Sequence, residues 1–141
     1  MSTQRRRGAE AAELKTNELT ALIIEQAIEI HRALGPGLLE TVYETVLEKK
    51  LSDSGLKVGR QIPMPVRYEG LSFKEAFRID PFVEDRVVLE IKATEAVAKV
   101  HKRQLLTYLK LSGASVGLLL NFGAAIMRSG IVRVVNQFNE Q

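Results

Sequence analysis

Two strongly apolar segments, residues 86–93 (RVVLEIKA) and 115–121 (SVGLLLN), most constrain the fold of this chain. Each has the length of one strand and is largely apolar on both faces, which is typical of strands covered on both sides of a sheet. The residues between them have helical periodicity over 94–111, with Thr94 as the expected N-cap and Gly113 as the stop. The apolar stripe of this helix consists of Val97, Val100, Gln104, Leu105, Tyr108 and Leu109. This order predicts a right-handed β-α-β unit whose two strands are parallel.

Helical periodicity also predicts two helices at the start of the chain. The first covers residues 17–34, and the second begins near Leu39 and ends near Gly55. The segment Gly35-Pro36-Gly37 separates them, because neither glycine nor proline continues a helix. Such a short connection predicts that the two helices pack as neighbours.

Alternating apolar residues predict strands over 56–68 and 71–80, joined by a turn at Glu69-Gly70. Pro63 and Pro65 favour an edge position for the first of them. After a second turn at 81–85, the strand at 86–93 completes a three-stranded meander, and a short strand at 131–135 closes the chain. We therefore expect one α/β domain with a mixed sheet and flanking helices, in the order helix, helix, three strands, helix, strand, strand.

Length and composition set wider limits. With 141 residues, the chain fits one domain over 16–141, preceded by a mobile basic tail over 1–15 that contains three consecutive arginines. The absence of cysteine excludes disulfides, zinc–thiolate sites and iron–sulfur clusters. No segment is long and apolar enough to span a membrane, and no signal core follows the tail, which favours the cytoplasm. The net charge of +3 permits a nucleic-acid partner without requiring one.

The central strand carries a charged pair, Glu90 and Lys92. Side chains alternate along a strand, so these two share a face while Leu89 and Ile91 occupy the other. Burying a carboxylate and an ammonium is unfavourable unless they pair. By itself the pair therefore favours a structural ion pair slightly over a functional site.

Asp80 shifts that balance towards function. A short turn can bring it beside Glu90, and two adjacent carboxylates repel each other unless a cation lies between them. Magnesium or manganese would satisfy this requirement with the two carboxylates and the Ile91 carbonyl as ligands. Lys92 could then orient or deprotonate an attacking water, or stabilise charge on phosphate. The chemistry that suits this set is phosphodiester hydrolysis.

These residues resemble a known nuclease signature. Asp80 followed by Glu90-Ile91-Lys92 is similar to the D…(D/E)xK motif of the PD-(D/E)XK superfamily, with Ile79 at the position of the proline. Residues 37–43 (GLLETVY) fit the pattern that names the GxxExxY family, a bacterial group within that superfamily. The stretches RID, LEIKA, QLLTYL and LLLNFG extend the resemblance from about residue 20 to residue 136.

The resemblance implies a restriction-endonuclease-like core and adds three residues to the site. Glu40 is similar to a helical carboxylate that some members direct at the metal, the alternative being a solvated glutamate like Glu44 and Glu48. Gln104 and Tyr108 resemble a supporting Q-x-x-x-Y pair on one helix face, the alternative being an interior glutamine bound by backbone. Tyr43 either bonds a site carboxylate or packs in the core.

A basic cluster lies on the predicted helix after the central strand. It contains Lys99, His101, Lys102 and Arg103, and Arg60, Arg67 and Arg78 are further candidates for phosphate contact. A solvated charged face is the default alternative. His31, alone on the first helix, is expected to be structural.

The leading hypothesis is a magnesium- or manganese-dependent nuclease that hydrolyses nucleic acid, with DNA favoured over RNA as the partner but the choice left open. Asp80, Glu90, Ile91 and Glu40 would hold the ion, Lys92 would act on water, and Gln104 and Tyr108 would support the site. The alternative is an inactive module with the same fold that binds nucleic acid or a protein partner. Edge strands, with the residues 132–135, would also allow a homodimer.

Overall fold

The computed structural model describes residues 13–136, so the expected basic tail over 1–15 lies mostly outside the described residues. The elements are α2 (Thr16–Leu34), α3 (Glu40–Asp53), β1 (Val58–Gly59), β2 (Ile62–Tyr68), β3 (Leu71–Ile79), β4 (Phe82–Val83), β5 (Val87–Lys92), α4 (Lys99–Ser112), β6 (Val116–Asn121), the 3-10 turn η1 (Met127–Gly130) and β7 (Ile131–Val135). Within this part of the chain, no helix has the length and apolar character needed to cross a bilayer.

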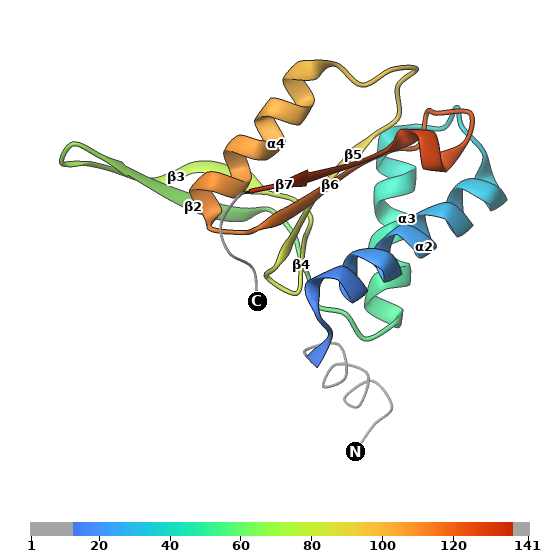
Figure 1. The fold of residues 1–141 in the computed structure, drawn as a ribbon, viewed down its shortest axis with the longest axis horizontal. Helices are drawn as coiled ribbons and strands as arrows, with labels where there is room; N and C mark the ends of the chain where they lie inside the picture. Colours follow the sequence, from blue (N-terminus) through green and yellow to red (C-terminus); the bar gives the residue numbers. More distant parts are fainter. Residues whose placement is uncertain (1–12, 137–141) are drawn as a thin grey trace.

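The main sheet has five strands in the order β1-β4-β5-β6-β7, with α4 on one face and α2 and α3 on the other (Figure 1). Strands β5 and β6 pair in parallel from Val87↔Val116 to Lys92↔Asn121, and the other neighbours are antiparallel. The parallel β-α-β unit and the central position of residues 86–93 are therefore confirmed. The single α/β domain with a mixed sheet is confirmed as well.

Two apolar cores lie on the two faces of this sheet. Leu89, Ile91 and Leu118 pack against α2 and α3, whereas Val88 and Leu119 pack under α4. Side chains alternate along β5, so Glu90 and Lys92 share the α4 side with Val88. The charged pair thus lies on the face that α4 covers.

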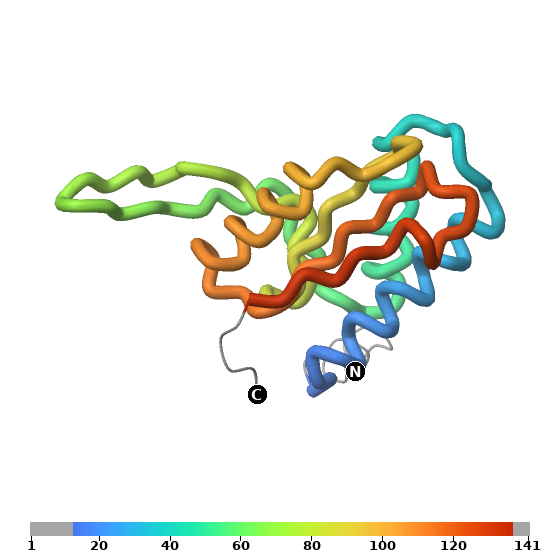
Figure 2. The backbone as a smooth tube through the Cα atoms, turned by 45° about the horizontal axis from the view of Figure 1, so that its top comes forward, coloured from blue at the N-terminus to red at the C-terminus, as the bar shows by residue number. Residues whose placement is uncertain are grey.

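The predicted three-stranded meander is wrong. Strands β2 and β3 form a separate two-stranded ribbon that projects from the body of the protein (Figure 2), so of the strands before β5 only β4 pairs with it. Beyond its base the ribbon has no helix over it, and Tyr68 and Leu71 are 67% and 61% exposed. The alternating pattern correctly identified strands but could not tell which strand each would pair with, because that depends on contacts distant in sequence.

Helix α4 begins at Lys99, five residues later than the predicted start at Thr94. The backbone N–H of Thr94 donates instead to the side chain of Asn121 at 3.0 Å, so this residue belongs to the end of the sheet. The predicted stripe also needs correction. Leu105 and Leu109 are buried, but Val100 and Gln104 are exposed, because the shorter helix covers the sheet with a narrower face.

Tyr43 packs in the core, the second of its two expected roles. Its ring is fully buried and stacks on Phe122 with a centroid separation of 4.6 Å. Its hydroxyl donates to the Gly35 carbonyl at 2.6 Å and accepts from the Leu38 N–H at 3.1 Å. Tyr43 therefore fixes the turn between α2 and α3, in which Gly35 and Gly37 have φ values of +70° and +105° that favour glycine.

Replacing Tyr43 by phenylalanine should lower the free energy of unfolding by about 1–2 kcal/mol, because the ring stack remains but the buried hydroxyl and its two hydrogen bonds to the backbone of the turn are lost. Urea denaturation monitored by circular dichroism measures this change. The control is Tyr68→Phe, whose exposed hydroxyl should matter by less than about 0.5 kcal/mol. Equal effects of the two substitutions would contradict the role assigned to the Tyr43 hydroxyl.

Candidate active site

Glu90 and Lys92 form an ion pair on β5. The Lys92 Nζ lies 3.1 Å from Glu90 Oε2, and the two side chains are only 22% and 19% exposed. Their common face follows from strand alternation, and their partial burial follows from the cover provided by α4. Each charge is thus partly desolvated and neutralised by the other.

Asp80 lies two residues before β4, the strand that pairs with β5. In the antiparallel pairing of these strands Phe82 faces Val88, and the Leu89 N–H donates to the Pro81 carbonyl at 3.0 Å. The strand register does not extend to Asp80, which precedes Pro81 across a cis peptide bond, and the side chain of Asp80 bonds Arg60. The predicted proximity of Asp80 and Glu90 therefore stays a prediction.

The Ile91 carbonyl is turned to the same edge of β5. On the opposite edge, the Phe122 N–H donates to the Lys92 carbonyl at 2.8 Å. Backbone carbonyls alternate in direction along a strand, so the Ile91 carbonyl points away from β6 and towards β4. Because β4 begins only at Phe82, the last backbone bond described on this edge of β5 is that between Leu89 and Pro81.

Arg60, which follows β1, joins Asp80 to two glutamates of α3. Its Nε and Nη2 atoms donate to the two oxygens of Asp80, the second at 3.3 Å. Its Nη2 also lies 2.8 Å from a Glu44 oxygen, and its Nη1 lies 2.6 Å from a Glu48 oxygen. Arg60 is therefore not the free phosphate contact that the sequence suggested. Glu44 and Glu48 are not solvated either, since their side chains are 22% and 31% exposed.

Burial raises the pKa of the Glu44 carboxyl above its ordinary value. The Arg60 charge opposes this rise in pKa, and the Asp80 carboxylate adds to it. The hydrogen bond to Asp80 raises the already high pKa of the Arg60 guanidinium, so Arg60 stays charged at any physiological pH. The carboxylates around Arg60 therefore depend on its positive charge for their stabilisation.

The group around Arg60 carries an excess of negative charge. One guanidinium bonds three half-buried carboxylates, those of Glu44, Glu48 and Asp80, which gives this cluster a formal charge of −2. Glu90 pairs separately with Lys92. Carboxylate and carbonyl oxygens, which Asp80, Glu90 and Ile91 would supply, are ligands that hard divalent cations such as magnesium and manganese prefer. Within residues 13–136, however, no three Asp, Glu, His or Cys side chains are arranged to hold an ion.

The three residues that the resemblance added are more exposed than expected. Glu40 is exposed at the first position of α3, one turn before Glu44 on the same helix face. Gln104 is also exposed and donates to the Tyr108 hydroxyl at 3.1 Å. Tyr108 is half-buried and stacks on Phe77 at the base of the ribbon, with ring centroids 4.7 Å apart. Gln104 and Tyr108 therefore form a pair, but Gln104 does not meet the sheet.

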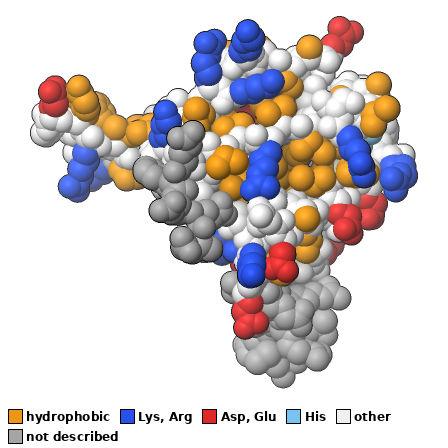
Figure 3. All heavy atoms as spheres, in the orientation of Figure 1, with side chains coloured by type: hydrophobic (Ala, Val, Ile, Leu, Met, Phe, Trp, Pro, Cys, Tyr) orange, Lys and Arg blue, Asp and Glu red, His pale blue; other side chains and the backbone are white. Residues whose placement is uncertain are grey.

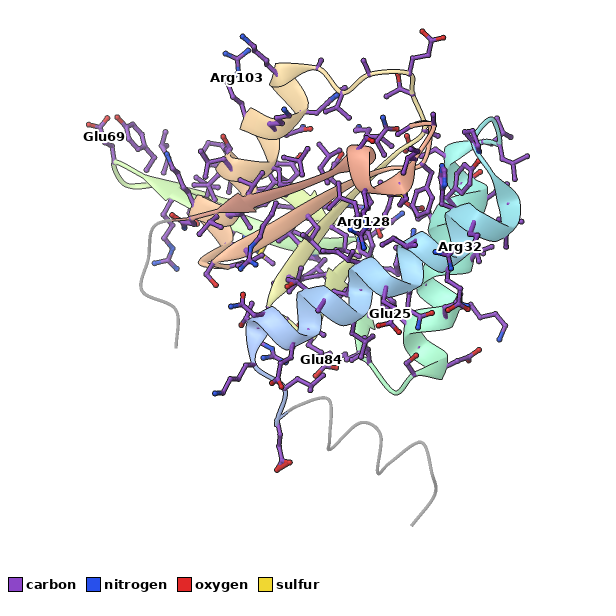
Figure 4. The ribbon with its side chains drawn as sticks, turned by 45° about the vertical axis from the view of Figure 1, so that its right-hand side comes forward. Glu25, Arg32, Glu69, Glu84, Arg103 and Arg128 are labelled. Atoms are coloured by element: carbon purple, nitrogen blue, oxygen red, sulfur yellow. The ribbon has the colours of Figure 1, made fainter. Side chains whose placement is uncertain are left out.

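Most of the predicted phosphate-binding residues lie on the surface. Lys99, Lys102 and Arg103 are exposed on the first turns of α4, where basic side chains gather (Figure 3) and Arg103 points away from the sheet (Figure 4). Arg78 is exposed on β3, where it donates to Glu75 and Gln61.

The two histidines differ from each other in their surroundings. His101 was expected on the basic surface, but it is half-buried, and its Nδ1 atom is buried without a hydrogen-bond partner among the described residues. It lies one turn before the buried Leu105 on the same face of α4, which is why it turns inward. His31 is buried at 8% exposure and its Nε2 lies 2.8 Å from the Ala124 carbonyl, in agreement with the structural role predicted for it.

Asn121, which was not among the predicted site residues, holds the chain just after Lys92. Its Oδ1 atom accepts the N–H groups of Thr94 and Gly123, and its Nδ2 donates to the Thr94 carbonyl at 2.9 Å. The approach is so close that a Cβ on Gly123 would lie 2.2 Å from the Thr94 carbonyl oxygen. The available signal was a polar residue at the end of an apolar strand, followed by glycine.

Replacing Asn121 by alanine should lower the free energy of unfolding by about 3 kcal/mol, because three backbone groups lose their partner in a buried place. Asn17→Ala is the matched control, since the Asn17 amide is exposed and accepts one bond from Arg133. It should change the free energy by less than about 1 kcal/mol. Denaturation of both variants in urea tests this difference, and a small effect at Asn121 would show that water replaces its contacts.

Comparison with known proteins identifies the family of the chain. A family model described as the PD-(D/E)XK nuclease superfamily matches residues 17–134. No curated protein and no solved structure gives a significant match to the chain. The matched segment runs from α2 to β7 and includes Asp80, Glu90 and Lys92. The chain therefore belongs to the PD-(D/E)XK nuclease superfamily.

Proposed function

We propose that this protein hydrolyses phosphodiester bonds of nucleic acid with magnesium or manganese, as a member of the GxxExxY family within its superfamily. The observation that supports the proposal is the half-buried pair of Glu90 and Lys92, 3.1 Å apart on one face of β5, in a chain that matches the nuclease superfamily over residues 17–134. Asp80 would supply the second carboxylate.

Asp80, Glu90 and the Ile91 carbonyl would hold the ion at the edge of β5 that β4 leaves free. When bound, the ion would polarise a phosphoryl oxygen and assist the ionisation of water. Glu40 could contribute from α3 by a change of side-chain rotamer, since it lies one helical turn, about 6 Å of rise, from Glu44. The excess of two negative charges in the cluster supports a divalent rather than a monovalent cation.

Lys92 would act on the water or on the phosphate. Once the Glu90 carboxylate turns to an ion, the Lys92 ammonium loses part of its ion pair and becomes free to donate to a phosphate oxygen or to orient the nucleophile. Gln104 and Tyr108 would support the site from α4. Their mutual hydrogen bond and the stack of Tyr108 on Phe77 fix their side chains between α4 and the ribbon.

Isosteric substitutions test this assignment. Glu90→Gln, Asp80→Asn and Lys92→Met should each lower the rate of cleavage of labelled DNA by at least about 100-fold in manganese, because each removes a charge from the reacting region. The wild-type chain should be inactive in EDTA. Labelled RNA in parallel tests the preference for DNA.

The control for these variants is Glu25→Gln. Glu25 is an exposed residue of α2, distant from the site (Figure 4), and its substitution should leave the rate unchanged. The assignment would be wrong if the Glu90, Asp80 and Lys92 variants kept the wild-type rate.

The basic residues at the start of α4 would contact the phosphate backbone. Lys99, Lys102 and Arg103 are exposed there on the helix that covers the site. Replacing all three by alanine should weaken DNA binding and reduce the slope of log K against log salt by about three. Fluorescence anisotropy, with calcium as the divalent ion and with about 50 to 200 mM salt, would measure this slope. Lys49→Ala, on the exposed surface of α3, is the control and should leave the slope unchanged.

A second candidate function is a binding module without turnover. The observation that favours it is that each carboxylate of the pair already has a protein cation, Arg60 for Asp80 and Lys92 for Glu90. Such pairing can stabilise a fold that no longer needs a metal. DNA binding that is equal with and without calcium, together with no cleavage in manganese, would support the binding module against the nuclease.

A further inference from the structure

The contacts of Arg60 suggest how an ion would enter the site. Its guanidinium group engages both oxygens of Asp80 at once, through Nε and Nη2. This contact occupies one lone pair on each oxygen of Asp80 and fills the space on that side of the carboxylate, so fewer positions remain for an ion. A divalent cation that binds Asp80 would also lie close to a second positive charge, which is unfavourable in a half-buried place.

Arg60 already has two partners other than Asp80. Its Nη1 bonds Glu48 at 2.6 Å and its Nη2 bonds Glu44 at 2.8 Å, and both of these glutamates lie on α3, away from β5. If the guanidinium let go of Asp80, it would still have two carboxylates for its one charge. Release of Asp80 therefore does not leave a buried cation without a partner.

We propose that Arg60 is a built-in competitor for the metal: it neutralises Asp80 in the ion-free protein, and binding of a divalent cation proceeds by exchange, with Arg60 withdrawing to Glu44 and Glu48. The inference rests on the proposed function, because it assumes that Asp80 is a metal ligand. It assigns to Arg60 a role that its sequence position does not suggest.

The proposal predicts that removing the Arg60 charge tightens metal binding. In Arg60→Gln, manganese should bind the full-length chain at least about tenfold more tightly than in the wild type, because the competing cation is gone. Isothermal titration calorimetry with manganese alone, without nucleic acid, measures the affinity directly. Arg60→Lys keeps the charge but loses the bidentate contact with Asp80. The affinity of this variant for manganese should therefore lie between those of the wild type and Arg60→Gln. Arg67→Gln, on the exposed surface of β2, is the matched control and should bind like the wild type.

A double-mutant cycle shows whether the gain acts through Asp80. In the background of Asp80→Asn, the substitution Arg60→Gln should give no increase in manganese affinity, because the shared carboxylate is absent. Circular dichroism establishes that each variant is folded, and Arg60→Lys carries the test if Arg60→Gln does not fold.

The outcomes separate the two proposals. If the wild type binds manganese and neither Arg60 variant binds it more tightly, the competition is wrong while the metal site remains supported; weaker binding by the variants would mean that Arg60 positions Asp80 as a ligand. A gain that persists in the Asp80→Asn background also overturns the competition. If no variant binds manganese at all, the metal-dependent function and the competition both fail.

Discussion

The shortage of positive charge at the end of β4 is the constraint on which the site depends. Half-buried carboxylates repel each other, and burial alone raises the pKa of the Glu44 carboxyl. Two cations neutralise part of this charge: Arg60 pairs with Asp80, and Lys92 pairs with Glu90. Two cations do not balance four carboxylates, so the arrangement is stable enough to form and still attractive to a further cation. A fully neutralised cluster would have no such attraction.

The shortness of β4 determines where that site lies. Because β4 consists of Phe82 and Val83 only, the edge of β5 is paired as far as Leu89 and is then free. The last part of β5 is held in place from its other side, by β6 and by the Asn121 amide. One edge of β5 therefore supplies rigidity and the other supplies ligands. A longer β4 would cover the carbonyl of Ile91 with a backbone hydrogen bond.

The sequence predicted those parts of the site that depend on local periodicity. Strand alternation placed Glu90 and Lys92 on one face, and the structure pairs them there. Residues 40, 44 and 48 are all glutamates on one face of α3, so no local pattern could tell which turn of the helix meets the sheet. The answer depends on how α3 packs, which is a long-range property. Arg60 gave no periodic signal at all, because it lies between two short strands.

The base of the ribbon formed by β2 and β3 adjoins the acidic cluster around Arg60. The pairing of β2 with β3 ends at Ile62↔Ile79, and Arg60 and Asp80 lie just beyond this pair on the two strands that enter and leave the ribbon. Their ion pair therefore closes the base of a ribbon whose outer half lies outside both cores, where a two-stranded arrangement has little stability of its own. The residues that hold the base of the ribbon are therefore also residues of the acidic cluster, so one ion pair serves both parts of the structure.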